Sequence, residues 1–324
     1  MNATRGWIGS AIVLVLLCCT GNAPGQNYPA RPIRILVPFA PGGVGDLTAR
    51  VVTQKMGEAF GQQIIVDNRP SAGGIVASEI VAKAEPDGYT ILLLNNLHAV
   101  SPSLFKSLPY DPVKDFAPVS TLGAFSLVFL VSPDSGIKSI KDLIATAKAN
   151  PGKLNMGTIN IGATQNLSAE LFKSMAGLDL VVVPFNSTAA VITGLRGNNV
   201  QAAVEVLAPV IGQIRAGALR AIAVTTPKRF AGLPDVPTVL ESGVPGYEVI
   251  AWNGVGVPAR TPRAIIDRLN KAMHAALASP EVKQRFQELG VEARPSTPEA
   301  FHKFLVAEIA KWKAVTEKAK IPKQ

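Results

Sequence analysis

Short apolar runs alternate with amphipathic segments along most of the chain. The runs, of three to five residues and mostly rich in Ile, Leu, Val and Ala, occur at Ile33–Val37, Ile64–Val66, Thr90–Leu94, Leu127–Val131, Leu154–Gly157, Leu180–Val183, Ala202–Val206 and Arg220–Val224. Short, nearly continuous apolar runs are typical of strands that are covered on both faces. The pattern therefore predicts mostly parallel sheets flanked by helices.

Helix starts can be recognised in several segments between these runs. Ser139 and Asp142 resemble a capping box, and the Asn-Pro-Gly stretch at 150–152 ends the helix that they open. Three later helices open with a hydroxyl residue before a proline, at Thr261-Pro262, Ser279-Pro280 and Thr297-Pro298. Since 324 residues suggest two domains, we expect an α/β fold with one such sheet in each of two lobes.

Residues 1–25 have the order of a secretory signal peptide. Arg5 precedes the apolar run Ala11–Cys19, and a stretch of small residues follows it. The run is too short for a membrane-spanning helix, which needs about 20 apolar residues. We expect cleavage after Gly25, with Gly21 as the alternative, and a mature protein in the periplasm. A lipoprotein signal is the less favoured alternative, because a leucine precedes the first Cys.

Composition and charge exclude several classes of protein. The chain is 48% hydrophobic and 17% charged, which excludes a disordered chain or a disulfide scaffold. Loss of Arg5 leaves 31 basic against 23 acidic residues, a net charge of +8 that suits anions but is equally explained by solvated surface charge. Two adjacent Cys and three scattered His exclude a clustered Cys and His zinc site, and we expect no metal and no cofactor.

Loops rich in small and neutral polar residues follow the predicted strands. In open α/β sheets, ligands bind beyond the carboxyl ends of the strands, where helices begin. Backbone N–H groups and helix dipoles in such loops suit an anion, although a single loop of this kind is usually an ordinary turn. Their recurrence in both halves of the chain favours a carboxylate or phosphate pocket between Pro41–Gly45, Ser71–Gly74 and Gly162–Gln165. The candidate ligand-binding residues are Pro41, Gly42, Gly43, Val44, Gly45, Asp46, Ser71, Ala72, Gly73, Gly74, Asn96, His98, Thr158, Gly162, Ala163, Thr164, Gln165, Asn186, Ser187 and Glu205.

Catalytic motifs are not recognisable in the sequence. The nucleophile elbow G-x-S-x-G, the phosphate loop and the H-E-x-x-H motif are all missing. Glycines at 254 and 256 imitate a dinucleotide fingerprint, but in the wrong order relative to the strand. Asp46 is a candidate general base that is more often a helix N-cap, and His98 is either structural or directed into the cleft. We therefore expect no enzyme.

Six stretches of the mature chain share their pattern with a known family. They are R-P-I-R-I-L-V-P-F-A-P-G-G-V-G-D-L-T-A-R (31–50), V-D-N-R-P-S-A-G-G (66–74), P-D-G-Y-T-I-L-L (86–93), D-L-I-A-T-A-K-A-N-P-G-K-L-N (142–155), L-P-D-V-P-T-V-L-E-S-G-V-P-G-Y-E (233–248) and W-N-G (252–254). Together they resemble the periplasmic solute-binding proteins of the tripartite tricarboxylate transporter family, also called Bug proteins. The resemblance covers essentially the whole mature chain.

The resemblance implies a two-lobed, periplasmic-binding-protein-like fold (Venus flytrap, type II-like), with a carboxylated metabolite held between the lobes. We expect 26–125 and 226–324 in the first lobe and 126–225 in the second, with crossings near 120–127 and 223–228. The implied role is delivery of a small carboxylate ligand to membrane permease subunits of a tripartite tricarboxylate-type transporter. The resemblance implies no nucleic acid partner, and we expect a monomer.

The match to the family is uneven between the two lobes. Pro41–Gly43 and Asp46 match the family's first loop, and Ala72–Gly74 match its second. Where the family usually has G-x-G-S-x-x-H, this chain has N-I-G-A-T-Q-N at 160–166, so that Ala163 and Asn166 replace the Ser and the His. The second lobe is therefore expected to bind its ligand differently from other members.

Three other classes of function share parts of the pattern. A LysR-type regulator has a similar lobed domain, but it needs a helix-turn-helix where this chain has a signal peptide and its first strand. An exported enzyme needs a nucleophile and base pair, which the sequence does not show. The sequence has no feature that separates a ligand-presenting sensor subunit for a signalling partner from a transport protein, so this alternative function stays open.

Intact-mass analysis of the periplasmic fraction tests the signal peptide. We expect a mature chain that begins near Gln26 and contains no disulfide, because cleavage removes both Cys. Detection of an uncleaved Met1 or of a diacylglyceryl mass would contradict this.

Overall fold

The computed structural model describes residues 28–323, so the predicted signal peptide and its cleavage site lie outside the described residues. The strands are β1 (Ile33–Val37), β2 (Ile64–Asn68), β3 (Thr90–Asn95), β4 (Phe116–Val131), β5 (Asn155–Ile159), β6 (Val181–Phe185), β7 (Ala202–Val206), β8 (Arg220–Val224), β9 (Ile250–Pro258) and β10 (Val291–Ala293). The helices are α1 (Val44–Phe60), α2 (Ile75–Ala82), α3 (Asn96–Leu104), α4 (Ile140–Ala149), α5 (Thr164–Met175), α6 (Thr188–Arg196), α7 (Leu207–Arg215), α8 (Arg263–Ala278), α9 (Pro280–Glu288) and α10 (Pro298–Lys318), with a short 3₁₀ turn at Ala72–Gly74.

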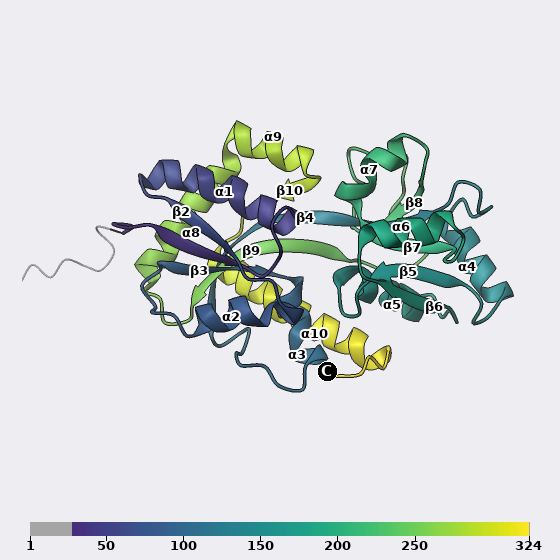
Figure 1. Cartoon of the computed structure of the whole chain (residues 1–324), viewed down its shortest axis with the longest axis horizontal. Coiled ribbons are helices and arrows are strands. Elements are labelled where there is room, and N and C mark those ends of the chain that lie inside the picture. The colour runs from purple at the N-terminus through teal and green to yellow at the C-terminus, as the bar shows by residue number, and fades with distance from the viewer. Residues whose placement is uncertain (1–27, 324) are drawn as a thin grey trace, which may run out of the picture.

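One long strand, β4, runs through both lobes of the molecule (Figure 1). The strand order is β2-β1-β3-β9-β4-β7-β5-β6, and β8 and β10 also pair with β4. Residues 116–126 of β4 pair with β9, and three of them also with β10, whereas residues 127–131 pair with β7 and β8. The first crossing between the lobes therefore lies within a continuous strand, at the end of the predicted range 120–127.

Each lobe contains a mixed sheet rather than a fully parallel one. Strands β1, β2 and β3 are parallel, and so are β5, β6 and β7, but β9 is antiparallel to β3, and β4 is antiparallel to β7. Alternate side chains of each strand enter different cores. Ile35 and Val37 of β1 pack with α1 and α8, while Leu36 packs with α2 and α3.

The second crossing follows Val249 and not residues 223–228, where we expected it. The segment 226–249 stays on the second lobe, because Tyr247 packs against Phe129 and Phe172 and shares a hydrogen bond of 2.6 Å with the hydroxyl of Ser168. The chain returns to the first lobe only where Ile250 opens β9. We propose this point as the second lobe boundary, in place of residue 226.

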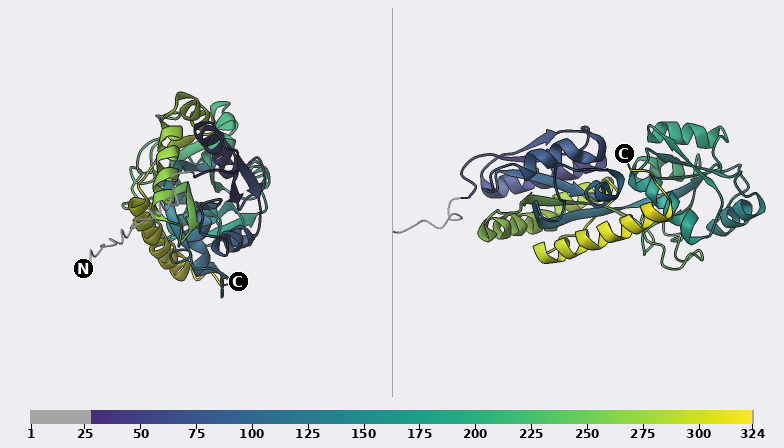
Figure 2. Two further views of the ribbon diagram at one scale, coloured as in Figure 1. Left: turned by 90° about the vertical axis from the view of Figure 1, so that its left-hand side faces the viewer. Right: turned by 90° about the horizontal axis from the view of Figure 1, so that it is seen from below.

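The C-terminal helix α10 joins the two lobes on one side of the sheet. It packs on α3 of the first lobe and reaches α5 of the second (Figure 2). Phe301, Leu305 and Trp312 of this helix belong to an apolar core that also contains Phe129 and Phe172. Among residues 28–323, no helix combines the length and the apolar character required to cross a bilayer.

Most of the predicted helix starts are confirmed. The hydroxyl groups of Ser139, Ser279 and Thr297 each accept a hydrogen bond from a backbone N–H in the first turn of α4, α9 and α10. Thr261 differs, because α8 begins one residue later with Pro262 as its cap, and the Thr261 hydroxyl donates to the Pro258 carbonyl. The predicted proline thus precedes the helix instead of opening it.

His98 is a structural residue of the first lobe. At the third position of α3, its Nδ1 accepts the Asn95 N–H at 3.1 Å, and its Nε2 lies 3.0 Å from the Ser78 hydroxyl. The imidazole is fully buried. Burial lowers the pKa of His98 to about 4, although the hydrogen bond with Asn95 opposes this shift. The ring therefore stays neutral and completes a capping box.

Acid should destabilise the protein through His98. The unfolded chain takes up a proton near the ordinary imidazole pKa, whereas the folded chain does not, so stability is lost as the pH falls from about 6.5 towards 4. We expect a loss of about 3 kcal/mol over this window. In His98→Gln, urea unfolding between pH 7 and pH 4 should show a smaller loss, because glutamine can accept the same N–H without titrating. The exposed His302→Gln is the control, and an equal acid loss in both variants would contradict the assignment.

Candidate functional site

A cleft of about 420 Å³ lies between the lobes, where five helices begin. The first lobe contributes the loop before α1, the start of α3 and part of β9, and the second lobe contributes the starts of α5, α6 and α7. The residues that line the cleft are Phe39, Ala40, Pro41, Gly43, Val44, Gly45, Asn95, Asn96, Leu97, Phe125, Ile159, Ala163, Thr164, Gln165, Thr188, Val206, Pro209, Ala251, Trp252 and Asn253.

The lining includes part of the predicted site. Eight predicted residues line the cleft, namely Pro41, Gly43, Val44, Gly45, Asn96, Ala163, Thr164 and Gln165. The other predicted residues lie outside the lining, namely Gly42, Asp46, Ser71, Ala72, Gly73, Gly74, His98, Thr158, Gly162, Asn186, Ser187 and Glu205. Several of these residues support the lining from behind and belong to the same polar loops, so a prediction based on polar loops included them.

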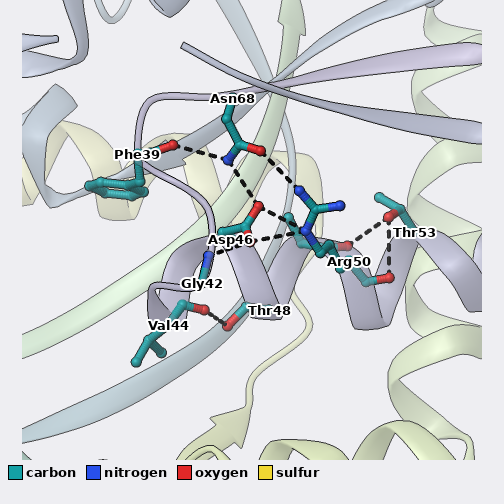
Figure 3. Close-up of polar contacts among 9 residues, drawn as sticks. Phe39, Gly42, Val44, Asp46, Thr48, Arg50, Thr53 and Asn68 are labelled. Carbon is teal, nitrogen blue, oxygen red and sulfur yellow. Dashed lines mark hydrogen bonds and ion pairs between the residues drawn. The ribbon is translucent and has the colours of Figure 1, made fainter. Parts of the chain in front are cut away.

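Asp46 fastens the loop that precedes α1 and is not its N-cap (Figure 3). Its buried carboxylate accepts the Gly42 N–H at 2.9 Å, the Arg50 Nε at 3.0 Å and the Asn68 amide at 2.9 Å. The Asn68 amide also donates to the Phe39 carbonyl at 3.0 Å. Burial opposes ionisation, but the hydrogen bonds from Arg50, Gly42 and Asn68 prevail and lower the pKa of Asp46. An ionised carboxylate with these partners holds the loop and is a poor general base.

The second lobe holds the start of α5 in the same way. Asn166 stands at the third position of the helix, and its side-chain oxygen accepts the Gly162 N–H at 3.1 Å. Its amide donates to the Thr158 hydroxyl at 3.3 Å. Gly162 has a φ of 81°, and a Cβ there would lie 2.2 Å from Leu104 of the first lobe. Thr158, Gly162 and Asn166 therefore shape the loop, while Ala163–Gln165 face the cleft.

The predicted loop Ser71–Gly74 supports the first loop from behind. Gly73 and Gly74 have φ angles of 62° and 70°, which favour glycine. A Cβ on Gly74 would lie 3.1 Å from the side chain of Pro38, next to the cleft loop. The Ser71 hydroxyl accepts the Val76 N–H at 3.0 Å. This loop thus positions the lining without belonging to it.

Helix starts and one free amide make the first-lobe side suitable for an anion. The N–H groups in the first turn of α1 have no acceptor within the helix, and the helix dipole adds partial positive charge there. The side-chain amide nitrogen of Asn253 is buried in the lining and has no hydrogen-bond partner among the described residues. In contrast, the Asn96 side chain is used internally, since it pairs with the backbone of Ile250 and Trp252.

Charged side chains are missing from the lining of this cleft, as far as the described residues show. Over the same range no group of three His, Cys, Asp or Glu side chains could hold a metal ion. A larger hollow of about 660 Å³ lies between α7, α9 and β10, and charged side chains of both signs line it, among them Arg215 and Glu292. Within the described chain only α7 begins there, so helix dipoles favour the smaller cleft as the anion site.

Glu205 lies directly behind the second-lobe side of the cleft. Its neighbour Val206 and its contact residues Thr188 and Gln165 all line the cleft. The Thr188 hydroxyl donates to Oε2 of Glu205 at 2.9 Å, whereas Oε1 is buried without a hydrogen-bond partner of normal geometry. Burial raises the pKa of Glu205 to about 7, in spite of the opposing contacts with Thr188 and Gln165.

Comparison with known proteins shows the family of this chain. The family model described as "Tripartite tricarboxylate transporter family receptor" matches residues 48–321. The chain belongs to this family. The family consists of substrate-binding proteins rather than enzymes. A UPF0065 protein of Pseudomonas sp. (strain P51) is 36% identical over 96% of this chain and 93% of its own, and Protein BugT of Bordetella pertussis is 34% identical over 97% of both chains.

Solved structures of relatives have the same fold. Rpa4515 of R. palustris with adipate is 34% identical, with a TM-score of 0.80, over 92% of this chain and 100% of that one. MatC from Rhodopseudomonas palustris with bound malate is 31% identical, with a TM-score of 0.76, over 89% and 99%. The predicted family and the periplasmic-binding-protein fold are thereby confirmed.

Sequence reasoning missed the β9 side of the cleft. Trp252 and Asn253 were part of a family motif and Ala251 precedes it, but nothing in their pattern marked them as ligand-facing. The usable signal was a polar residue, Asn253, inside an otherwise apolar and fully buried strand.

Removal of the Asp46 charge should loosen the loop before α1. In Asp46→Asn the amide cannot accept from Gly42, Arg50 and Asn68 together, and we expect a loss of about 2 kcal/mol in unfolding free energy. Amide exchange at Gly42 should accelerate. Asp142→Asn is the matched control, because the exposed Asp142 side chain accepts the Lys138 N–H with the same spacing at the start of α4, outside the cleft lining. Unchanged exchange at Gly42 would show that the loop holds itself.

Proposed function

We propose that this protein captures a small carboxylate-bearing metabolite between its lobes in the periplasm and delivers it to the permease subunits of a tripartite tricarboxylate-type transporter. The observation that carries the proposal is the convergence of five helix starts on an uncharged cleft. Such starts stabilise a negative charge by about 0.3–1 kcal/mol each, without a hydrated cation that must be stripped of water.

The size and polarity of the cleft support this substrate class. A volume of about 420 Å³ suits a small metabolite and is too small for a polymer. The ligand's carboxylate is proposed to bind the first-turn N–H groups of α1 and the free amide of Asn253. The backbone closest to this carboxylate is proposed to be that of Pro41–Gly45. The starts of α5 and α6, with Thr164, Gln165 and Thr188, are proposed to hold the opposite end of the ligand.

The bound ligands of two relatives support the same class. Adipate in Rpa4515 and malate in MatC are both small carboxylates. A ligand-presenting sensor would use the same cleft and would differ only in its partner. Loss of carboxylate uptake on deletion of the gene, restored by the intact gene, distinguishes delivery to a permease from signalling.

Gly43→Val should weaken ligand binding without unfolding the protein. Gly43 has an ordinary φ of −74° and lines the cleft, and a Cβ there would meet only the Ala40 carbonyl, at 3.9 Å. The valine side chain would therefore occupy space that we assign to the ligand. A thermal-shift screen of mono-, di- and tricarboxylates and aromatic acids identifies ligands, because binding to the native state raises its stability.

Calorimetry with the best ligand of that screen should then show at least a tenfold loss of affinity in Gly43→Val, about 1.4 kcal/mol. Gly212→Val is the control, since Gly212 is exposed on α7 with no atom near its Cβ position. A screen without any stabilising carboxylate would refute the proposed function. Unchanged affinity in Gly43→Val would instead move the site away from this loop.

A further inference from the structure

A buried carboxyl group without a cation lies behind the second-lobe side of the cleft. Glu205 is fully buried, and the groups that face it are the Thr188 hydroxyl from α6, the Gln165 amide from α5 and the Val206 N–H at the start of α7. Its partner across the sheet is Val128 of β4. Among the described residues, no Lys, Arg or His side chain is close enough to affect this carboxyl group.

The ionised form of Glu205 fixes the hydrogen-bonding character of Thr188. A hydroxyl group has one proton to donate and two lone pairs to accept with. Because Thr188 donates its proton to Oε2 of Glu205 at 2.9 Å, only its lone pairs remain for a group in the cleft. The lining of the second lobe then offers an acceptor at this point, with a negative charge directly behind it.

On the basis of the proposed function, we infer that Glu205 acts through Thr188 to select the end of the ligand that lies on the second lobe. While Glu205 is ionised, the cleft takes a carboxylate whose opposite end donates a hydrogen bond, such as a hydroxyl group. A second carboxylate binds only if Glu205 first takes up a proton. Glu205 is a positioning residue, and the ligand class is a monocarboxylate with a donor group at its other end.

The proton balance of the second case is explicit. The proton comes from water or buffer and forms an O–H bond on Glu205, which then donates to the oxygen of Thr188. The Thr188 hydroxyl group then no longer donates to Oε2 of Glu205. It can rotate so that its O–H points into the cleft and donates a hydrogen bond to the second carboxylate. One proton is therefore taken up with each dicarboxylate that binds above the pKa of Glu205, which burial raises to about 7.

Calorimetry with three matched pairs of probes tests this inference. The pairs are succinate with 4-hydroxybutyrate, glutarate with 5-hydroxypentanoate and adipate with 6-hydroxyhexanoate, so that chain length is constant within each pair. Above pH 7 we expect the affinity for the dicarboxylate to fall about tenfold per pH unit, with uptake of about one proton. The affinity for the hydroxy acid should change less than about twofold, because its binding requires no proton.

Glu205→Gln separates the charge from the shape of the side chain. Glutamine has the same size, stays neutral, and can donate to Thr188. We expect its dicarboxylate affinity to be independent of pH and, at pH 8.5, at least about tenfold higher than that of the wild type. The matched control is Glu170→Gln, which changes another second-lobe glutamate whose pKa burial raises, but one outside the cleft lining.

Thr188→Val tests whether Glu205 acts through the hydroxyl group. In that background Glu205→Gln should change the ratio of hydroxy acid to dicarboxylate affinity by less than about twofold, as expected when the linking group is missing. If Glu205→Gln does not fold, the pH profiles of the wild type with the three pairs of probes still test the inference.

The outcomes separate this inference from the proposed function. Binding of the dicarboxylates with no pH dependence, or with the same dependence in Glu205→Gln, would overturn the role of Glu205 and leave the carboxylate cleft intact. A failure of all six probes and of the wider carboxylate screen would overturn both.

Discussion

The cleft depends on one type of hydrogen bond that is found at a helix start on each side of it. At the starts of α1 and α5, the side chain of the third helical residue accepts the N–H of the glycine before the cap, from Gly42 to Asp46 at 2.9 Å and from Gly162 to Asn166 at 3.1 Å. Both glycines have a positive φ, of 88° and 81°, which a side chain would strain. The acceptor and the glycine are therefore required together, and they leave the first-turn N–H groups free for the cleft.

The two lobes differ in how they balance the charge near these helix starts. In the first lobe the Asp46 carboxylate would weaken the positive end of the α1 dipole, but its ion pair with Arg50 compensates that charge. In the second lobe Asn166 is neutral, and within residues 28–323 only uncharged groups face the nearby acid, Glu205. The acid at the first helix start thus stays ionised, whereas the charge of the acid in the second lobe depends on pH.

Sequence patterns were sufficient for the elements that follow simple periodicity. The buried strands of both lobes and the hydroxyl caps of α4, α9 and α10 were found because burial and capping leave local signals. The first half of β4 and all of β9 were less evident, because Pro118 and several glycines interrupt their apolar pattern. In β9 those glycines serve distant contacts, since a Cβ on Gly254 would lie 2.4 Å from Phe301 of α10.

The same distinction between local and distant contacts explains the uneven prediction of the site. Loops rich in glycine were visible in the sequence, but their residue types did not show which of these loops line the cleft. Ser71–Gly74 and Thr158 support the lining from behind, whereas Asn253 becomes a cleft residue only because β9 pairs with β3 and β4. Residues that line the cleft can be distinguished from residues that support the lining only in the tertiary structure, which a single sequence does not provide.

The floor of the cleft and the connection between the lobes are the same structure. Both crossings are tied by Thr225, whose hydroxyl contacts the backbone of Leu127 in β4 and of Val249 just before β9. Two residues further into the first lobe on each strand, Phe125 and Ala251 face each other across β4 and β9, and both line the cleft. Any change in the angle between the lobes must bend these two strands, because they are the only connections that the described chain makes through the sheet. Phe125 and Ala251 therefore place part of the cleft lining on the two strands that connect the lobes.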